Sequence, residues 1–386
     1  MSMEIGILTF GEMTRDPSTG RMPSPRQRLL DTLEQARLAD EVGLDVFGVG
    51  EHHRGDFIAS ATPVILSAIA AVTTRIRLAS TVTVLSSDDP VRIWEQYATI
   101  DQISGGRAEI MAGRGSYTES FPLFGYSLHD YDALFAEKLD LLLRIRDGNP
   151  VTWSGRFRAP LTDADIAPHA LQRRLPIWQA VGGTVASAIG AGRRGLPLMI
   201  AFLAGPIDAQ RGLVDSYHAA ASRAGVNPRS LRIGASVHGF VASHMRHARD
   251  VMYPHFVAGM SQNNHRRDEP FPLPREAFDL QAGPRGMIVA GGPQEVVDKI
   301  MTYRRLYGID RIMLQMGFGG VPQKEHLKAI ELLGTRVAPE IRRLTKDDAA
   351  PSAPPSSASD APPDQAWCHR AERPSQVTNR SSKEER

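Results

Sequence analysis

Residues 175–205 read LPIWQAVGGTVASAIGAGRRGLPLMIAFLAG and predict a strand at 175–183, a helix at 184–195 and a second strand at 196–205. Both strands are short apolar runs bounded by glycine or proline, and the residues between them recur with helical spacing. A strand, a helix and a strand in direct succession are typical of neighbouring parallel strands, because a helix carries the chain back across the sheet. The stretch therefore indicates a parallel α/β fold.

The same alternation runs through most of the chain. Further strands are expected at 4–10, 45–50, 75–85, 107–115, 231–243 and 309–320. Helices are expected near 26–42, 62–73, 90–103, 131–146, 207–224, 293–308 and 322–343. About eight strands, nearly all followed by a helix, predict an α/β fold of the (β/α)8 TIM-barrel type. The alternative is an open, doubly wound sheet in two domains.

The chain of 386 residues is longer than a barrel of this type needs, since such a barrel typically takes ~250 residues. We expect the surplus as insertions at about 148–172 and 259–290, which are rich in proline, arginine and polar residues. After residue 344 the composition shifts to proline, serine, alanine and aspartate, which cannot bury enough apolar surface to offset the entropy of ordering. We therefore predict a barrel domain over 1–344 and a disordered tail over 345–386.

Composition excludes several classes of protein. A formal net charge of +2 gives no electrostatic basis for binding nucleic acid or a membrane surface. No apolar run approaches the ~20 residues that cross a bilayer, and MSMEIGILTF lacks the features of a secretory signal, so we expect a cytoplasmic protein. The single cysteine, Cys368, excludes an internal disulfide and a cysteine-based zinc site.

The run LDVFGVGEHHRGDF (44–57) places an acid and two histidines at the end of the second strand, where barrel enzymes hold their active sites. Successive extended residues point to opposite sides, so His52 should point away from Glu51 and His53. Adjacent histidines in this geometry do not share a metal ion easily, and no H-E-x-x-H motif is present, so we predict no metal site. Either the pair fixes a loop, with Glu51 holding one ring, or one histidine serves the active site.

Two strand ends have features that suit a phosphate group, although neither a G-x-G-x-x-G motif after a strand nor a P-loop motif is present. Gly182 and Gly183 lie between a strand and a helix, where free backbone N–H groups favour an anion, and Ser187 lies in the first helical turn. Arg114, at the end of strand 107–115, can bind a phosphate with two N–H groups or form a surface ion pair. Together these positions indicate a cofactor with one phosphate.

The order of these motifs resembles that of the bacterial luciferase-like, flavin-dependent monooxygenase family. The matching stretches are ILTF (7–10), EHH (51–53), STVTVLSSDDPVRIWEQYATIDQISGGR (80–107), GRGSYTESFPLFGY (113–126) and AVGGTVASAIGAGRRGLPL (180–198). The resemblance spans about residues 3–344 and is most specific over 76–126. It implies a TIM-type barrel, in agreement with the strand count.

The resemblance also implies a cofactor and the residues that bind it. The expected cofactor is reduced FMN, or in some branches the deazaflavin F420, bound at the barrel mouth. Its ring system would lie against the third strand, where many members have a non-proline cis peptide that matches the Thr81–Val82 bond. The remaining matching positions are Arg114, Gly182, Gly183 and Ser187 on the phosphate side and His52 as the catalytic histidine.

The implied reaction is a monooxygenation. Reduced flavin would react with O2 at C4a to give a peroxyflavin that oxidises a small organic substrate, with His52 as acid/base or hydrogen-bond donor. A separate flavin reductase and a homodimer are further expectations. Gly113 stands where the light-producing luciferase subunit has a cysteine, so we do not expect light emission. The alternatives are an F420-dependent oxidoreductase that transfers hydride, a flavin-binding protein without catalysis, and a metal-dependent barrel hydrolase.

Overall fold

The computed structural model describes residues 2–115, 117–263 and 273–346. These residues belong to one compact unit, Met1–Pro351. The predicted disordered tail lies outside the described residues from 347 onward. Both its disorder and the domain boundary at 344 therefore stay predictions.

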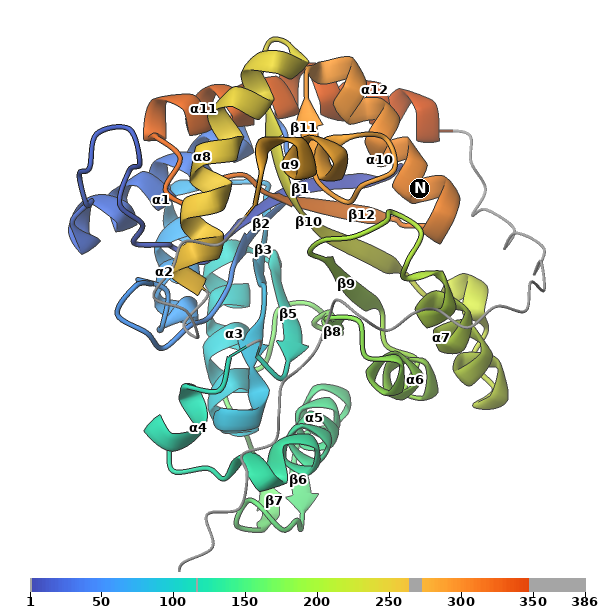
Figure 1. Cartoon of the computed structure of the whole chain (residues 1–386). Coiled ribbons are helices and arrows are strands. Elements are labelled where there is room, and N and C mark those ends of the chain that lie inside the picture. The colour runs from blue at the N-terminus through green and yellow to red at the C-terminus, as the bar shows by residue number, and fades with distance from the viewer. Residues whose placement is uncertain (1, 116, 264–272, 347–386) are drawn as a thin grey trace, which may run out of the picture. The chain divides into compact units, whose positions relative to one another are not determined.

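The described residues form a closed barrel of eight parallel strands surrounded by helices (Figure 1). In order around the ring the strands are β1 (Glu4–Thr9), β2 (Val46–Val49), β3 (Arg77–Ser80), β5 (Ala108–Gly113), β8 (Ile177–Val181), β9 (Leu198–Phe202), β10 (Ile233–Val241) and β12 (Arg311–Gln315). Pairing of β12 with both β10 and β1 closes the ring. The predicted (β/α)8 barrel is confirmed, and the open doubly wound sheet is wrong.

The predicted helices are present around the barrel. They are α1 (Pro25–Glu41), α2 (Thr62–Val72), α3 (Pro90–Ser104), α5 (Tyr131–Asp147), α6 (Val185–Arg193), α7 (Arg211–Arg223), α10 (Pro293–Tyr307), α11 (Gln323–Leu332) and α12 (Ala338–Thr345). Helix α3 shows how local signals set the ends of a helix. Pro90 is its first residue, and the Asp89 carboxylate before it accepts the N–H of Val91 at 2.8 Å. Gly105 ends the helix in the left-handed conformation, with a φ of 70°. A π-helical turn, Leu333–Val337, joins α11 to α12, so the helix predicted at 322–343 is interrupted.

Three elements between β10 and α10 were not predicted. They are α8 (Met245–Asn263), α9 (Arg275–Ala282) and β11 (Val289–Gly291), which lie together at the top of Figure 1. Pro254 lies inside α8, and a proline within a helical pattern normally indicates a break. The insertion predicted at 148–172 holds a short antiparallel hairpin of β6 (Val151–Trp153) and β7 (Leu161–Ala164). Two short elements also follow barrel strands: β4 (Thr83–Val84) and α4 (Ser120–Leu123).

The lower part of the barrel lumen is filled by buried charges under an apolar layer. Arg311 and Glu109 are 0% and 2% exposed, and Nη1 of Arg311 lies 2.6 Å from Oε2 of Glu109. Arg311 also contacts Glu4 at 2.6 Å, and its guanidinium lies 4.5 Å from the centre of a Trp178 ring. The apolar layer consists of Leu8, Val46, Ala79, Met111, Trp178, Met199 and Met313.

The upper part of the lumen is lined by smaller and less buried side chains. Val82, Ala180, Ala201 and Ser236 are only partly buried, whereas the layer below them is fully buried. Solvent-accessible space therefore reaches into the barrel at the carboxyl ends of its strands.

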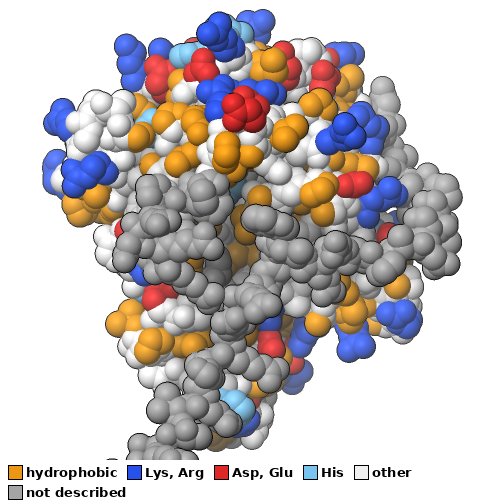
Figure 2. Space-filling view, in the orientation of Figure 1, with side chains coloured by type: hydrophobic (Ala, Val, Ile, Leu, Met, Phe, Trp, Pro, Cys, Tyr) orange, Lys and Arg blue, Asp and Glu red, His pale blue; other side chains and the backbone are white. Residues whose placement is uncertain are grey.

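On the described part of the face in Figure 2, basic and acidic side chains are interspersed. Across residues 2–115, 117–263 and 273–346, no helix is both long enough and apolar enough to cross a membrane. The expected cellular location stays a prediction.

Candidate active site

His52 lies in the barrel mouth, just beyond the end of β2. The residue is 5% exposed, and its ring is enclosed by three aromatic rings. The ring-centre distances from His52 are 4.8 Å to Phe10, 4.4 Å to Phe57 and 4.8 Å to Tyr117. Phe10 packs on the apolar cluster of the lumen, so His52 faces the open end of the barrel.

His53 has different surroundings. Its Nε2 lies 2.8 Å from Oε1 of Glu51, and the other oxygen of Glu51 accepts the N–H of Val84 at 3.0 Å. Glu51 thus joins the loop after β2 to β4 and holds the ring of His53. The two histidines have separate partners, as their predicted opposite orientation requires, and the division of their roles stays a prediction.

A carboxylate that we did not predict faces His52. Oε1 of Glu119 lies 3.4 Å from Nδ1 of His52 and 3.4 Å from the backbone nitrogen of His53. Burial raises the pKa of Glu119, but hydrogen bonds from His52 and from the Glu119 and His53 backbone outweigh it and hold that pKa below its usual range. Glu119 therefore stays ionised beside the ring.

The wall of the mouth next to His52 is formed by the end of β3. The Thr81–Val82 peptide bond is cis, as the resemblance implied. Thr81 is 8% exposed, and its Oγ1 has no hydrogen-bond partner within the described parts of the chain. Gly113 packs against this wall, because an added Cβ there would lie 2.6 Å from Cγ2 of Val82.

Two predicted phosphate-binding residues meet at the start of α6. Nη2 of Arg114 donates to Oγ of Ser187 at 2.8 Å, although 73 positions separate the two residues. Nη1 of Arg114 binds the exposed Asp132, so the alternative prediction of a surface ion pair is confirmed, while phosphate binding stays a prediction.

Gly182 and Gly183 lead into the same helix. Gly182 is exposed, and a Cβ added there would meet no atom within 4 Å; Gly183 has a φ of 109°, which favours glycine. The first backbone N–H groups of a helix lack intrahelical partners. The structure thus brings Arg114, Ser187 and both glycines to one helix N-terminus.

Residues 3–310 match the family model described as luciferase-like monooxygenase. The chain belongs to the luciferase-like monooxygenase family. It is 31% identical to the N-acetyl-S-alkylcysteine monooxygenase of Bacillus subtilis over 178 residues, which are 45% of this chain and 51% of that protein. The monooxygenase RslO1 of Streptomyces bottropensis shares 25% identity and a TM-score of 0.72 over 88% of this chain and 99% of its own.

Two other solved structures of this fold were determined with a cofactor or its adduct. The oxygenating constituent of 3,6-diketocamphane monooxygenase from Pseudomonas putida, in complex with FMN, has 21% identity and a TM-score of 0.70 over 88% of this chain and 99% of its own. An F420-dependent secondary alcohol dehydrogenase, in complex with an F420-acetone adduct, has 17% identity and a TM-score of 0.67 over 87% of this chain and 100% of its own. At these identities the likeness is one of fold alone.

The mouth of this luciferase-like barrel has the features that a flavin with one phosphate needs. The buried Thr81 hydroxyl has no partner among the described residues, the side chains above the apolar layer are only partly buried, and Arg114 and Ser187 stand at a helix N-terminus. Among the residues that the structure describes, no group of three or more histidine, cysteine, aspartate or glutamate side chains is placed to hold a metal ion.

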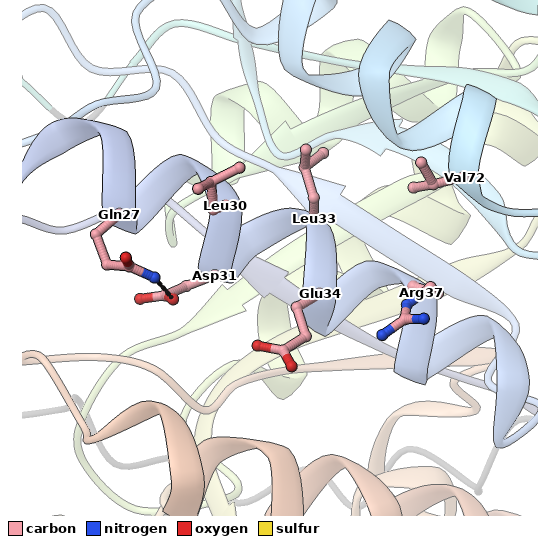
Figure 3. Close-up of a pocket in the computed structure, with 7 residues that line it drawn as sticks. All are labelled: Gln27, Leu30, Asp31, Leu33, Glu34, Arg37 and Val72. Carbon is pink, nitrogen blue, oxygen red and sulfur yellow. Dashed lines mark hydrogen bonds between the residues drawn. The ribbon is translucent and has the colours of Figure 1, made fainter.

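Two hollows lie outside this mouth. A groove of about 330 Å³ over α1 is lined by Gln27, Leu30, Asp31, Leu33, Glu34, Arg37 and Val72 (Figure 3). None of these residues belongs to the luciferase-like site. A cavity of about 560 Å³ lies between the loops after β1 and β2 and the end of α8. Asp56 lines it and binds Arg54, whose guanidinium lies 4.7 Å from the Tyr117 ring centre. This cavity therefore adjoins the surroundings of His52.

Proposed function

We propose that the protein is a flavin-dependent monooxygenase that uses reduced FMN and O2 to oxidise a small organic substrate. The observation that carries this proposal is the gathering, at one end of the barrel, of His52, the Thr81 hydroxyl that has no partner among the described residues, and the Arg114–Ser187 pair. Membership of the luciferase-like family and the FMN complex on the same fold support it.

Each end of the cofactor would have its own residues. Thr81 and Val82 would contact the ring system, while Arg114, Ser187 and the N–H groups around Gly182 and Gly183 would hold the phosphate. Reduced FMN supplies the electrons for the activation of O2 when it is bound.

His52 would act as the acid or base that gives a proton to, or takes one from, the reacting groups during the oxidation. Oε1 of Glu119 lies 3.4 Å from Nδ1, so Nε2 is the nitrogen left to give or take a proton. Phe10, Phe57 and Tyr117 enclose the ring and restrict the access of water to it.

Hydride transfer with F420 is the second candidate, because an F420-dependent enzyme shares the fold with a TM-score of 0.67. Anaerobic titration of the protein with FMNH2 and with reduced F420, followed by mixing with O2, separates the candidates. We expect the protein to bind FMNH2 and to change the rate and spectrum of its re-oxidation relative to free FMNH2. Binding of reduced F420 but not of FMNH2 would contradict the proposal. Binding of FMNH2 without any change in its rate of re-oxidation would favour a flavin-binding protein without catalysis.

The proposal includes two partners. The barrel and its insertions account for the described residues, so we propose that a separate flavin reductase supplies the reduced FMN. We also propose that the functional assembly is a homodimer. Activity that depends on an added reductase, and a measured mass of twice the chain mass, test these two statements.

Replacement of Arg114 by glutamine should weaken FMN binding about 10-fold to 100-fold, because charge-assisted hydrogen bonds contribute about 1.5–3 kcal/mol. Riboflavin has no phosphate, so its affinity should change little. Fluorescence titration with both flavins measures this difference. Arg92→Gln, on the outer surface of α3, is the matched control. Equal losses for FMN and riboflavin would mean that Arg114 does not bind the phosphate.

Replacement of Glu119 by glutamine should lower kcat about 10-fold, because it removes the carboxylate that lies 3.4 Å from Nδ1 of His52 and helps to orient the ring. Glu119→Asp keeps a carboxylate and should restore much of the rate. An unchanged kcat in Glu119→Gln would leave Glu119 with a purely structural role.

A further inference from the structure

A second buried histidine lies in the mouth, on β10. An added Cβ at Gly234 would meet Met199 and Trp178 of the lumen, so the alternate residues Gly234, Ser236 and His238 face the lumen. His238 is 6% exposed. Its Nδ1 is buried and has no hydrogen-bond partner in the part of the chain that the structure describes.

The position of His238 in the ring of strands places it across from the proposed flavin wall. Four steps separate β10 from β3 in the order β10, β12, β1, β2, β3, which is half of the eight-stranded ring. Ser236, two residues deeper on the same face, is only partly buried, so solvent reaches the lumen along this face of β10. A molecule between the Thr81–Val82 wall and β10 would reach both sides.

The surroundings of His238 are apolar. Its ring centre lies 4.6 Å from that of Phe318 and 5.2 Å from that of Phe256, which meets it edge-on. Gln315, its register partner on β12, already donates to Glu12 at 2.6 Å. Burial lowers the pKa of His238 to about 4, so the ring is uncharged at neutral pH.

An unpaired polar atom in such a place is costly unless a ligand or water pairs with it. An uncharged imidazole can give or accept one hydrogen bond, but it offers no positive charge to a carboxylate. The nearby Glu12 is itself negative and is already paired with Arg28 at 3.6 Å. Burial of a substrate carboxylate here would therefore be unfavourable.

We propose that His238 is a substrate-binding residue and that the substrate is an uncharged molecule with an apolar body and one hydrogen-bonding group held by this histidine. This inference rests on the proposed function, because it takes the opposite wall as the flavin site.

The test compares three probes that share a phenyl ring: 1-phenylethanol, isopropylbenzene and benzoate. The alcohol and the hydrocarbon have nearly the same shape, and only the alcohol can form hydrogen bonds. Dissociation constants are measured by calorimetry on the full chain, both with and without oxidised FMN. We expect the alcohol to bind about 2-fold to 12-fold more tightly than isopropylbenzene, the range given by one net hydrogen bond. Benzoate should bind most weakly.

Two variants test whether His238 causes the preference for 1-phenylethanol over isopropylbenzene. His238→Leu should abolish the preference for the alcohol, while His238→Gln, which keeps a hydrogen-bonding amide, should retain part of it. Neither should change FMN affinity or the circular dichroism spectrum. A preference that survives in His238→Leu, no preference in the natural chain, or tighter binding of benzoate would each overturn the proposal. Failure of FMN to bind the natural chain would instead count against the proposed function, and the FMN-free titration would still test His238.

Discussion

Replacement of His52 by asparagine should lower kcat about 10²-fold to 10⁴-fold, the usual contribution of a positioned acid or base. Asparagine can still bond to Glu119 at the position of Nδ1, but it has no group that takes up a proton at the position of Nε2. The enclosing rings of Phe10, Phe57 and Tyr117 would remain. FMN affinity should therefore change little.

The measurement is product formation with a flavin reductase and a substrate found by screening, together with the re-oxidation rate of bound FMNH2. His169→Asn, at an exposed position, is the matched control and should behave like the natural chain. His53→Asn should lower the free energy of unfolding but change kcat little. The reason is that Glu51 holds His53 away from the three aromatic rings around His52. If His52→Asn retains most of the activity, the proposed proton transfer is wrong.

Replacement of Glu109 by glutamine should destabilise the fold by about 3–5 kcal/mol, because it leaves the buried Arg311 without its main counter-charge. Urea denaturation at pH 7 measures the free energy of unfolding. Glu95→Gln removes a surface partner of Arg92 on α3 and should cost less than about 1 kcal/mol. A loss no larger than that of Glu95→Gln would show that the charges in the barrel floor contribute little to stability.

The same carboxylate should make the fold sensitive to acid. Although burial raises the pKa of Glu109, Arg311 and Arg77 outweigh it and lower that pKa to about 2, against an ordinary value of 4.5. Because the folded-state pKa is the lower one, the stabilisation is present above pH 4.5 and is lost as the pH falls from 4.5 towards 2. In Glu109→Gln, the free energy of unfolding should fall less steeply over this window.

Much of the fold was predictable, because the barrel strands and helices repeat a local pattern. The run at 175–205 contains β8, α6 and β9 almost as expected. The region after β10 was not predictable in the same way. Pro254 lies within α8, whose helical conformation is compatible with the packing of Phe256 and its neighbours on the barrel.

The candidate site was predictable where residues lie at the ends of strands. Arg114 and Ser187 come from different strand–helix units, and the common mouth of the barrel brings them together. Glu119 was missed because the course of a loop after a strand does not follow from local pattern. His238 lies in the predicted strand 231–243, and alternation along that strand is the signal that would have placed it in the lumen.

The lumen of the barrel is closed at one end. Arg311, Glu109 and Trp178 fill it at the amino-terminal ends of the strands, so a ligand can enter or leave only at the carboxyl ends. In the proposed function, a flavin that lies against Thr81 and Val82 would have to bind before the substrate that covers it. It would be exchanged only after the oxidised product has left.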